Sequence, residues 1–122
     1  MTFNITEQQQ KLYECILKDV EEKSRFLESK QWIQHGITTI YEHSQNVALK
    51  CLELANKFKW KIDESSMIRG ALLHDYFLYD WHNKKTRVNP HGYLHPGVAL
   101  KNALKVYDLN KTEIDIIKHH LF

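Results

Sequence analysis

Apolar residues recur at helical spacing along most of the chain. Leu12, Ile16 and Val20 follow one another at intervals of four residues, which is the spacing of one face of a helix. No stretch alternates strictly between apolar and polar residues, as a half-buried strand would. The expected helices begin after Thr6, at about Thr38, at about Glu64, at Pro96 and after Asn110 or Thr112. The pattern therefore predicts one all-α domain of five or more helices.

Turn-forming residues separate an N-terminal helical segment from the rest of this single domain, which spans residues 1–122. Gln34-His35-Gly36 is typical of a turn, so residues 1–33 are expected to form the helical segment and residues 34–122 the core. The last helical pattern still runs at Phe122 without a stop signal. The natural domain is therefore expected to continue, which would leave this helical domain C-terminally incomplete.

The third and fourth expected helices are joined by a stretch rich in helix breakers. The third helix is expected to reach Tyr79, and the stretch from Trp81 to His95 is expected to be a loop. Pro96 suits the first position of the fourth helix, because its fixed φ angle fits a helix and its missing N–H would have no partner there.

Composition and charge narrow the class of protein. The chain is 43% hydrophobic and 26% charged, and 17 Lys and Arg against 15 Asp and Glu leave a net charge of +2. These values are ordinary for a globular domain, and they give no reason to expect a nucleic-acid polymer or a membrane as partner. Cys15 and Cys51 lack a CxxC spacing, so a reducing, cytoplasmic setting is expected.

Three of the polar residues fall where the helical pattern calls for apolar ones. His43 lies three residues after Ile40 on the stripe of the second helix, and His74 and Asp75 continue two apolar rows of the third. A buried, ionised carboxylate costs several kcal/mol or more unless something pairs with it. Either a distant Arg pairs with Asp75, or a bound cation does. A single His on such a face is more often a hydrogen-bonded core residue.

Taken together, these residues favour a metal site. His43, His74 and Asp75, with His95 and His119 on either side of a further helix, make a set of five candidate ligands. Imidazole and carboxylate together suit one or two divalent transition-metal ions such as Mn, Fe, Ni, Co or Zn. The set contains no thiolate, which argues against a structural zinc finger.

These residues resemble the HD superfamily of metal-dependent phosphohydrolases, and within it a group of small bacterial HD-domain proteins. The resemblance covers about residues 34–122. It rests on Tyr41-Glu42-His43-Ser44, Ala71-Leu72-Leu73-His74-Asp75, Phe77-Leu78-Tyr79-Asp80-Trp81-His82, His91-Gly92, His95-Pro96 and Ile116-Ile117-Lys118-His119.

The resemblance implies a role for each candidate ligand. In the family, the first His and the His-Asp pair bind one metal ion together with a later Asp, which assigns His43, His74 and Asp75 here. In the two-metal branches the Asp of the pair bridges to a second ion held by two more histidines. His95 and His119 would take those positions, with His120 a weaker candidate.

Two departures from the family pattern stand out. The last Asp of the family would lie beyond Phe122, and Asp80, Asp108 and Asp115 occupy other helical positions. The branch that acts on cyclic dinucleotides carries a Gly-Tyr-Pro motif after its His pair. Here His91-Gly92-Tyr93 is followed by Leu94 and precedes that pair, so the chain is not assigned to this branch.

The function expected from the resemblance is hydrolysis of a phosphomonoester or nucleotide by a metal-activated water, with Asp75 central to catalysis. Lys84, Lys85 and Arg87 are candidate contacts to the anionic substrate, although a charged run in a loop is usually solvated surface. The histidines that could support the ligands from behind are His82, His91 and His120. The expected partner is a small phosphorylated molecule. The sequence does not determine whether the protein forms a homodimer.

Two other functions fit the same residues. HD-like sites also serve di-iron oxygenases, which would show redox-active iron and no phosphatase activity. Alternatively, the missing last Asp would leave a module that binds a nucleotide or phosphate without turnover. Tight binding without hydrolysis would distinguish that module.

Overall fold

Helices account for most of the protein in the computed structural model, which describes residues 2–80, 82 and 91–119, with the side chains of residues 91–94 excepted. The chain runs in the order α1 (Glu7–Lys23), the 3-10 helix η1 (Phe26–Gln31), β1 (Ile33–His35), β2 (Thr38–Thr39), α2 (Ile40–Phe58), α3 (Glu64–Leu73), α4 (His91–Leu104) and α5 (Lys111–His119). The predicted all-α class is confirmed. None of these helices is long and apolar enough to cross a membrane.

Side-chain caps set where the main helices begin. Thr6 and Gln9 exchange hydrogen bonds in a capping box at the start of α1, and Thr39 with Glu42 does the same for α2. Asp63 caps α3, and Asn110 accepts from the backbone N–H of Glu113 at the start of α5. Each cap satisfies N–H groups that the first turn of a helix leaves without partners.

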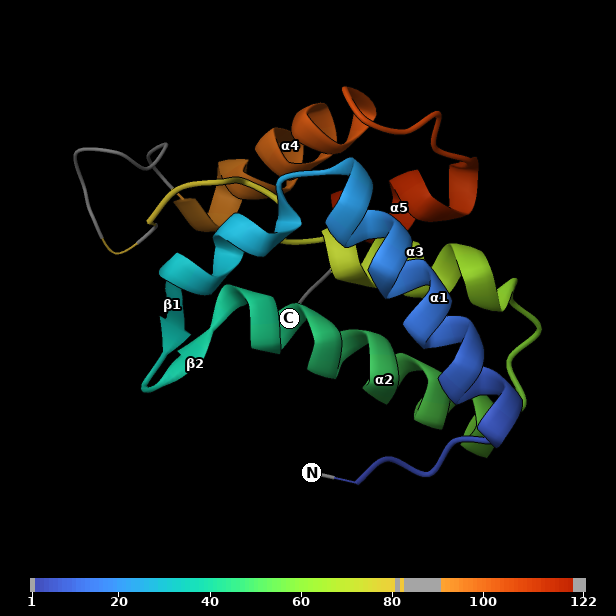
Figure 1. The fold of residues 1–122 in the computed structure, drawn as a ribbon. Coiled ribbons are helices and arrows are strands. Elements are labelled where there is room, and N and C mark those ends of the chain that lie inside the picture. Colours follow the sequence, from blue (N-terminus) through green and yellow to red (C-terminus); the bar gives the residue numbers. More distant parts are fainter. Residues whose placement is uncertain (1, 81, 83–90, 120–122) are drawn as a thin grey trace.

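Helix α3 forms the centre of the core. It packs against α1, α2 and α5, and Figure 1 shows α2 and α4 on opposite sides of it. Ile68 and Leu72 of α3 are fully buried, together with Val20 of α1 and Leu52 of α2. The residues that follow α3 are thereby held deep in the molecule, between α2 and α4.

The expectation that the chain has no strand is corrected at one place. Ile33 pairs with Thr39 and His35 with Thr38 in a short antiparallel hairpin, seen beside the start of α2 in Figure 1. The predicted turn lies at its tip, where Gly36 has φ +55°, a value that glycine adopts without steric cost. The pairs are too few for the alternation that would have predicted a strand.

The predicted end of the third helix, at Tyr79, is wrong. Helix α3 ends at Leu73, and the chain turns sharply, with Leu78 at φ 63°. Asn102 of α4 donates to the carbonyl oxygens of Tyr76 and Phe77 at 3.1 and 3.2 Å. The Asn102 side chain therefore donates hydrogen bonds to two carbonyl groups that would accept from backbone N–H groups if the helix continued.

The predicted start of the fourth helix is also wrong. Helix α4 begins at His91 and contains Pro96 in its interior, so the end of the expected 81–95 loop is helical. At the end of α2, Phe58 is 57% exposed and stacks on Trp60.

Gly70 of α3 lies close to Ile116 of α5, and it offers a test of this packing. A Cβ atom at Gly70 would lie 3.0 Å from Cβ of Ile116, whereas one at Gly97 of α4 would meet nothing within 4 Å. We expect Gly70→Val to lower the free energy of unfolding by about 1–3 kcal/mol through overpacking. Gly97→Val should change it by less than about 0.5 kcal/mol. Chemical denaturation measures both, and equal effects would contradict the close approach.

Candidate metal centre

His43, His74 and Asp75 form a group that could hold a metal ion. Their ligand atoms all lie within 4.8 Å of one another. Oδ2 of Asp75 lies 3.3 Å from Nε2 of His74 and 3.7 Å from Nε2 of His43. Donor atoms that share one ion at about 2.1 Å lie roughly 3 to 3.5 Å apart; the His74–Asp75 distance falls in this range, and the His43–Asp75 distance is slightly longer. The expected convergence of these residues is confirmed.

The sequence places each member of the group by local means. The capping box at Thr39 starts α2 at Ile40, three residues before His43. His43 therefore lies one helical turn after buried Ile40, on the same side of the helix. His74 and Asp75 follow directly after α3 and continue its buried face, so that both are almost completely buried. The two segments meet because α2 and α3 pack along their lengths.

A hydrogen bond orients the His74 ring. Nδ1 of His74 lies 2.5 Å from the carbonyl oxygen of Ala71. Because a carbonyl oxygen only accepts, Nδ1 carries the proton of the neutral ring, and the lone pair of Nε2 is on the side of Asp75. Metal-binding histidines in proteins are commonly held by such a bond on the second ring nitrogen.

The electrostatics of His74 reflect two opposed effects. Full burial disfavours the charged imidazolium, but the neighbouring Asp75 carboxylate and the hydrogen bond to Ala71 outweigh it and raise the pKa of His74 above its usual value. The Asp75 carboxylate is 4% exposed. Positive charge next to it, whether a proton or a cation, is therefore favoured.

His95 approaches the other oxygen of the same carboxylate. Its Nε2 lies 3.5 Å from Oδ1 of Asp75, and its ring packs edge-on against Phe77 at 5.7 Å. His95 reaches this position from α4, 20 residues further along the chain. The two oxygens of Asp75 thus face different histidines, His43 and His74 on one side and His95 on the other.

The remaining predicted ligand and supporting residues are placed as follows. His119 is the last residue of α5, and its side chain is exposed; it is not in the candidate group found among the described residues. His82 is exposed, and its ring lies 3.3 Å from the carbonyl oxygen of Gln34. The other predicted substrate-binding and supporting residues lie outside the described part of the chain. They are Lys84, Lys85, Arg87, His120 and, for its side chain, His91. Their roles stay predictions.

Sequence reasoning did not single out a cavity that adjoins the group. Its lining includes His43 and, further along α2, Asn46 and Lys50. The signal was present, because these residues follow His43 at three and seven positions and so share one side of the helix.

The comparison with known proteins identified no relative of this chain. No family model, no curated protein and no solved structure matches the chain. The residues of the site are therefore the basis on which a function can be inferred.

Proposed function

We propose that the protein is a metal-dependent phosphohydrolase of the HD type that acts on a phosphomonoester or nucleotide. The observation that carries the proposal is the position of Asp75, whose two carboxylate oxygens face histidines from different elements at 3.3 to 3.7 Å. A carboxylate in this position can bridge two cations. Bridged pairs of metal ions are typical of enzymes that hydrolyse phosphate esters.

The residues of the chain would divide the work between them. His43, His74 and one oxygen of Asp75 would hold the first ion, and His95 with the other oxygen would contribute to a second, for which His119 is the further predicted ligand. A divalent ion, when bound, lowers the pKa of water toward about 7 and so supplies a nucleophile at neutral pH. Mn, Fe, Co, Ni and Zn all suit these donors.

The burial of His74 and Asp75 also prepares these two residues to bind a cation. The hydrogen bond to Ala71 holds the His74 ring, and the surrounding core buries both this ring and the Asp75 carboxylate, so that little reorganisation would be needed for a cation to bind. Preorganised charge in a site of low dielectric is the main source of stabilisation for charge that develops in a transition state.

The test is metal-dependent hydrolysis and its loss in one variant. With Mn²⁺, Co²⁺ or Ni²⁺ added, the protein should hydrolyse at least one ester in a panel of phosphomonoesters and nucleotides. His95→Ala should lower kcat at least about 100-fold, an effect of the size seen when transition-state stabilisation is lost, and should leave the thermal unfolding temperature nearly unchanged.

His35→Ala is the matched control, because His35 is an exposed histidine of β1 and should retain full activity. Equal rates for both variants would remove His95 from the site. Redox-active iron without phosphatase activity would replace the proposal by an oxygenase, and tight phosphate binding without turnover would replace it by a binding module.

A further inference from the structure

A cavity of about 380 Å³ opens beside the candidate metal centre and extends along α2. Its lining consists of Phe3, His43, Asn46, Val47, Lys50, Cys51 and Leu54. The six residues from α2 follow one another at alternating intervals of three and one, which places them all on one side of the helix. Since His43 also belongs to the candidate metal group, the cavity and the metal centre have this residue in common.

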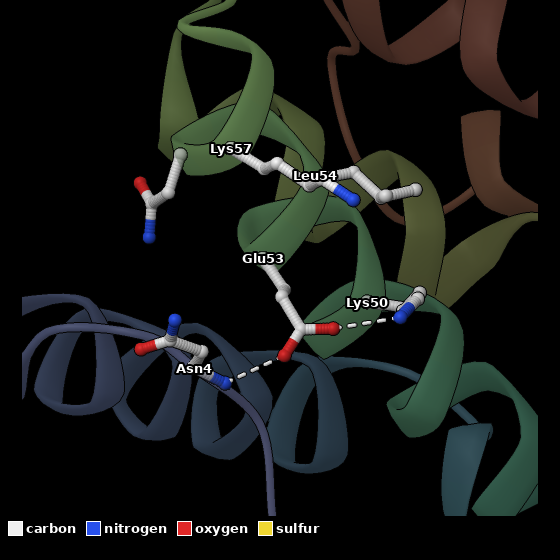
Figure 2. A pocket seen from close by; sticks show the side chains of 6 residues that line it. Asn4, Lys50, Glu53, Leu54 and Lys57 are labelled. Carbon is white, nitrogen blue, oxygen red and sulfur yellow. Dashed lines mark hydrogen bonds and ion pairs between the residues drawn. The ribbon is translucent and has the colours of Figure 1, made fainter.

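Phe3 adds the N-terminal segment to this lining, and α2 holds that segment in place. The backbone N–H of Asn4 donates to Oε2 of Glu53 at 2.7 Å, and Nζ of Lys50 lies 2.7 Å from Oε1 of the same carboxylate. Figure 2 shows both contacts in a neighbouring cavity that shares Lys50 and Leu54. Glu53 thereby holds the segment that carries Phe3 and also pairs with the exposed ammonium group of Lys50.

The two ends of the cavity differ in chemistry. At one end lies His43, beside the Asp75 carboxylate. Beyond it the wall is largely apolar, with Val47, Leu54 and Phe3. Burial raises the pKa of the Cys51 thiol above its usual value, so that this side chain is uncharged at neutral pH. Apolar surface at one end and a cation site at the other suit a ligand with an apolar body and an anionic head.

We propose that this cavity binds the organic group of the substrate and selects phosphomonoesters whose organic group is an apolar ring system. This inference rests on the proposed phosphohydrolase function. The phosphate would lie at the His43 end, since Lys50 is already paired with Glu53. At 1.5 Å per residue, Cys51 lies about 12 Å along the helix axis from His43, which leaves room for one or two fused rings between them.

Polar organic groups fit the same cavity poorly. Apart from His43, the lining side chains that form strong hydrogen bonds are those of Asn46 and Lys50. A glycerol or sugar group would lose hydrogen bonds to water against Val47, Leu54 and Phe3 without replacement. An aromatic ring would gain from the burial of its apolar surface, by about tenfold or more in affinity.

The test compares two phosphonates that cannot be hydrolysed, naphthalen-1-ylmethylphosphonate and methylphosphonate, by calorimetry on the Mn²⁺-loaded protein. The naphthyl compound should bind at least about tenfold more tightly. Phe3→Ala and Cys51→Asp should reduce this preference to less than about threefold, because they remove or charge the apolar wall. Cys15→Asp is the matched control, because Cys15 is exposed and lies outside the lining of this cavity, and it should keep the preference. The affinity for methylphosphonate should be unchanged in all variants.

Equal affinity for the two compounds, or failure of both to bind, would overturn the inference. So would a preference that survives in Phe3→Ala, a variant that alters only the N-terminal segment and leaves the helical core intact. Rates on 1-naphthyl phosphate and glycerol 2-phosphate separate this inference from the proposed function. A binding preference without hydrolysis would refute the function and keep the cavity, whereas hydrolysis of both esters at equal kcat/KM would keep the function and refute the cavity.

Discussion

Replacing Asp75 by alanine is expected to abolish metal binding while the helices stay folded. The carboxylate lies within 3.3 to 3.7 Å of ring nitrogens of His43, His74 and His95, so its removal takes away the anion that the candidate ligands have in common. Loss of a residue that merely supports a ligand costs about 10- to 100-fold in metal affinity. Loss of the shared carboxylate should therefore cost at least about 100-fold. Metal analysis after dialysis measures the stoichiometry, and circular dichroism measures the helices.

Two further variants sharpen the interpretation of Asp75→Ala. Asp75→Asn keeps the shape of the side chain but removes its charge, and it should also lose the metal, because a neutral amide binds a divalent cation more weakly than a carboxylate. Asp108→Ala removes an exposed carboxylate and should leave the stoichiometry unchanged. Unaltered metal content in Asp75→Ala would refute the assignment of this group as a metal centre.

Glu113→Ala is expected to lower the free energy of unfolding by about 3 to 5 kcal/mol, the range for breaking a buried ion pair by removing one partner. The Glu113 carboxylate is almost completely buried and lies 2.9 Å from Nη1 of Arg69 in α3. Its other oxygen accepts from the backbone N–H of Asn110 at 2.9 Å. The substitution would leave the Arg69 charge without this partner and would also remove half of the capping box of α5. Urea denaturation measures the change.

Two matched variants distinguish how the charge, the shape and the burial of the Glu113 side chain contribute to the loss of stability in Glu113→Ala. Glu113→Gln can still accept hydrogen bonds from Arg69 and Asn110, so its loss of stability should be less than half as large. Glu28→Ala breaks the ion pair between Glu28 and Arg25, in which both side chains are exposed. It should have a much smaller effect, because solvent screens an exposed pair. Equal losses for Glu113→Ala and Glu28→Ala would show that burial of the pair is unimportant.

Much of the local structure could be predicted from the sequence because it depends on neighbours along the chain. Thr6, Asp63 and Asn110 cap the helices that the pattern placed after them, since a cap needs only a side-chain oxygen within three residues of a helix N–H. The placement of His43, His74 and Asp75 on inner faces followed from helical periodicity alone. Their convergence at one point is confirmed.

Tertiary structure decided what depends on partners far away in the sequence. Helix α3 ends at Leu73 where Asn102, 29 residues further on, takes up the carbonyl groups of the following turn. His95 lies beside Oδ1 of Asp75 because α4 is bonded to that turn through Asn102. Phe3 lines the cavity beside His43 because Glu53 holds Asn4. Periodicity determines which face of a helix is buried, but the packing of elements remote in sequence determines what that face meets.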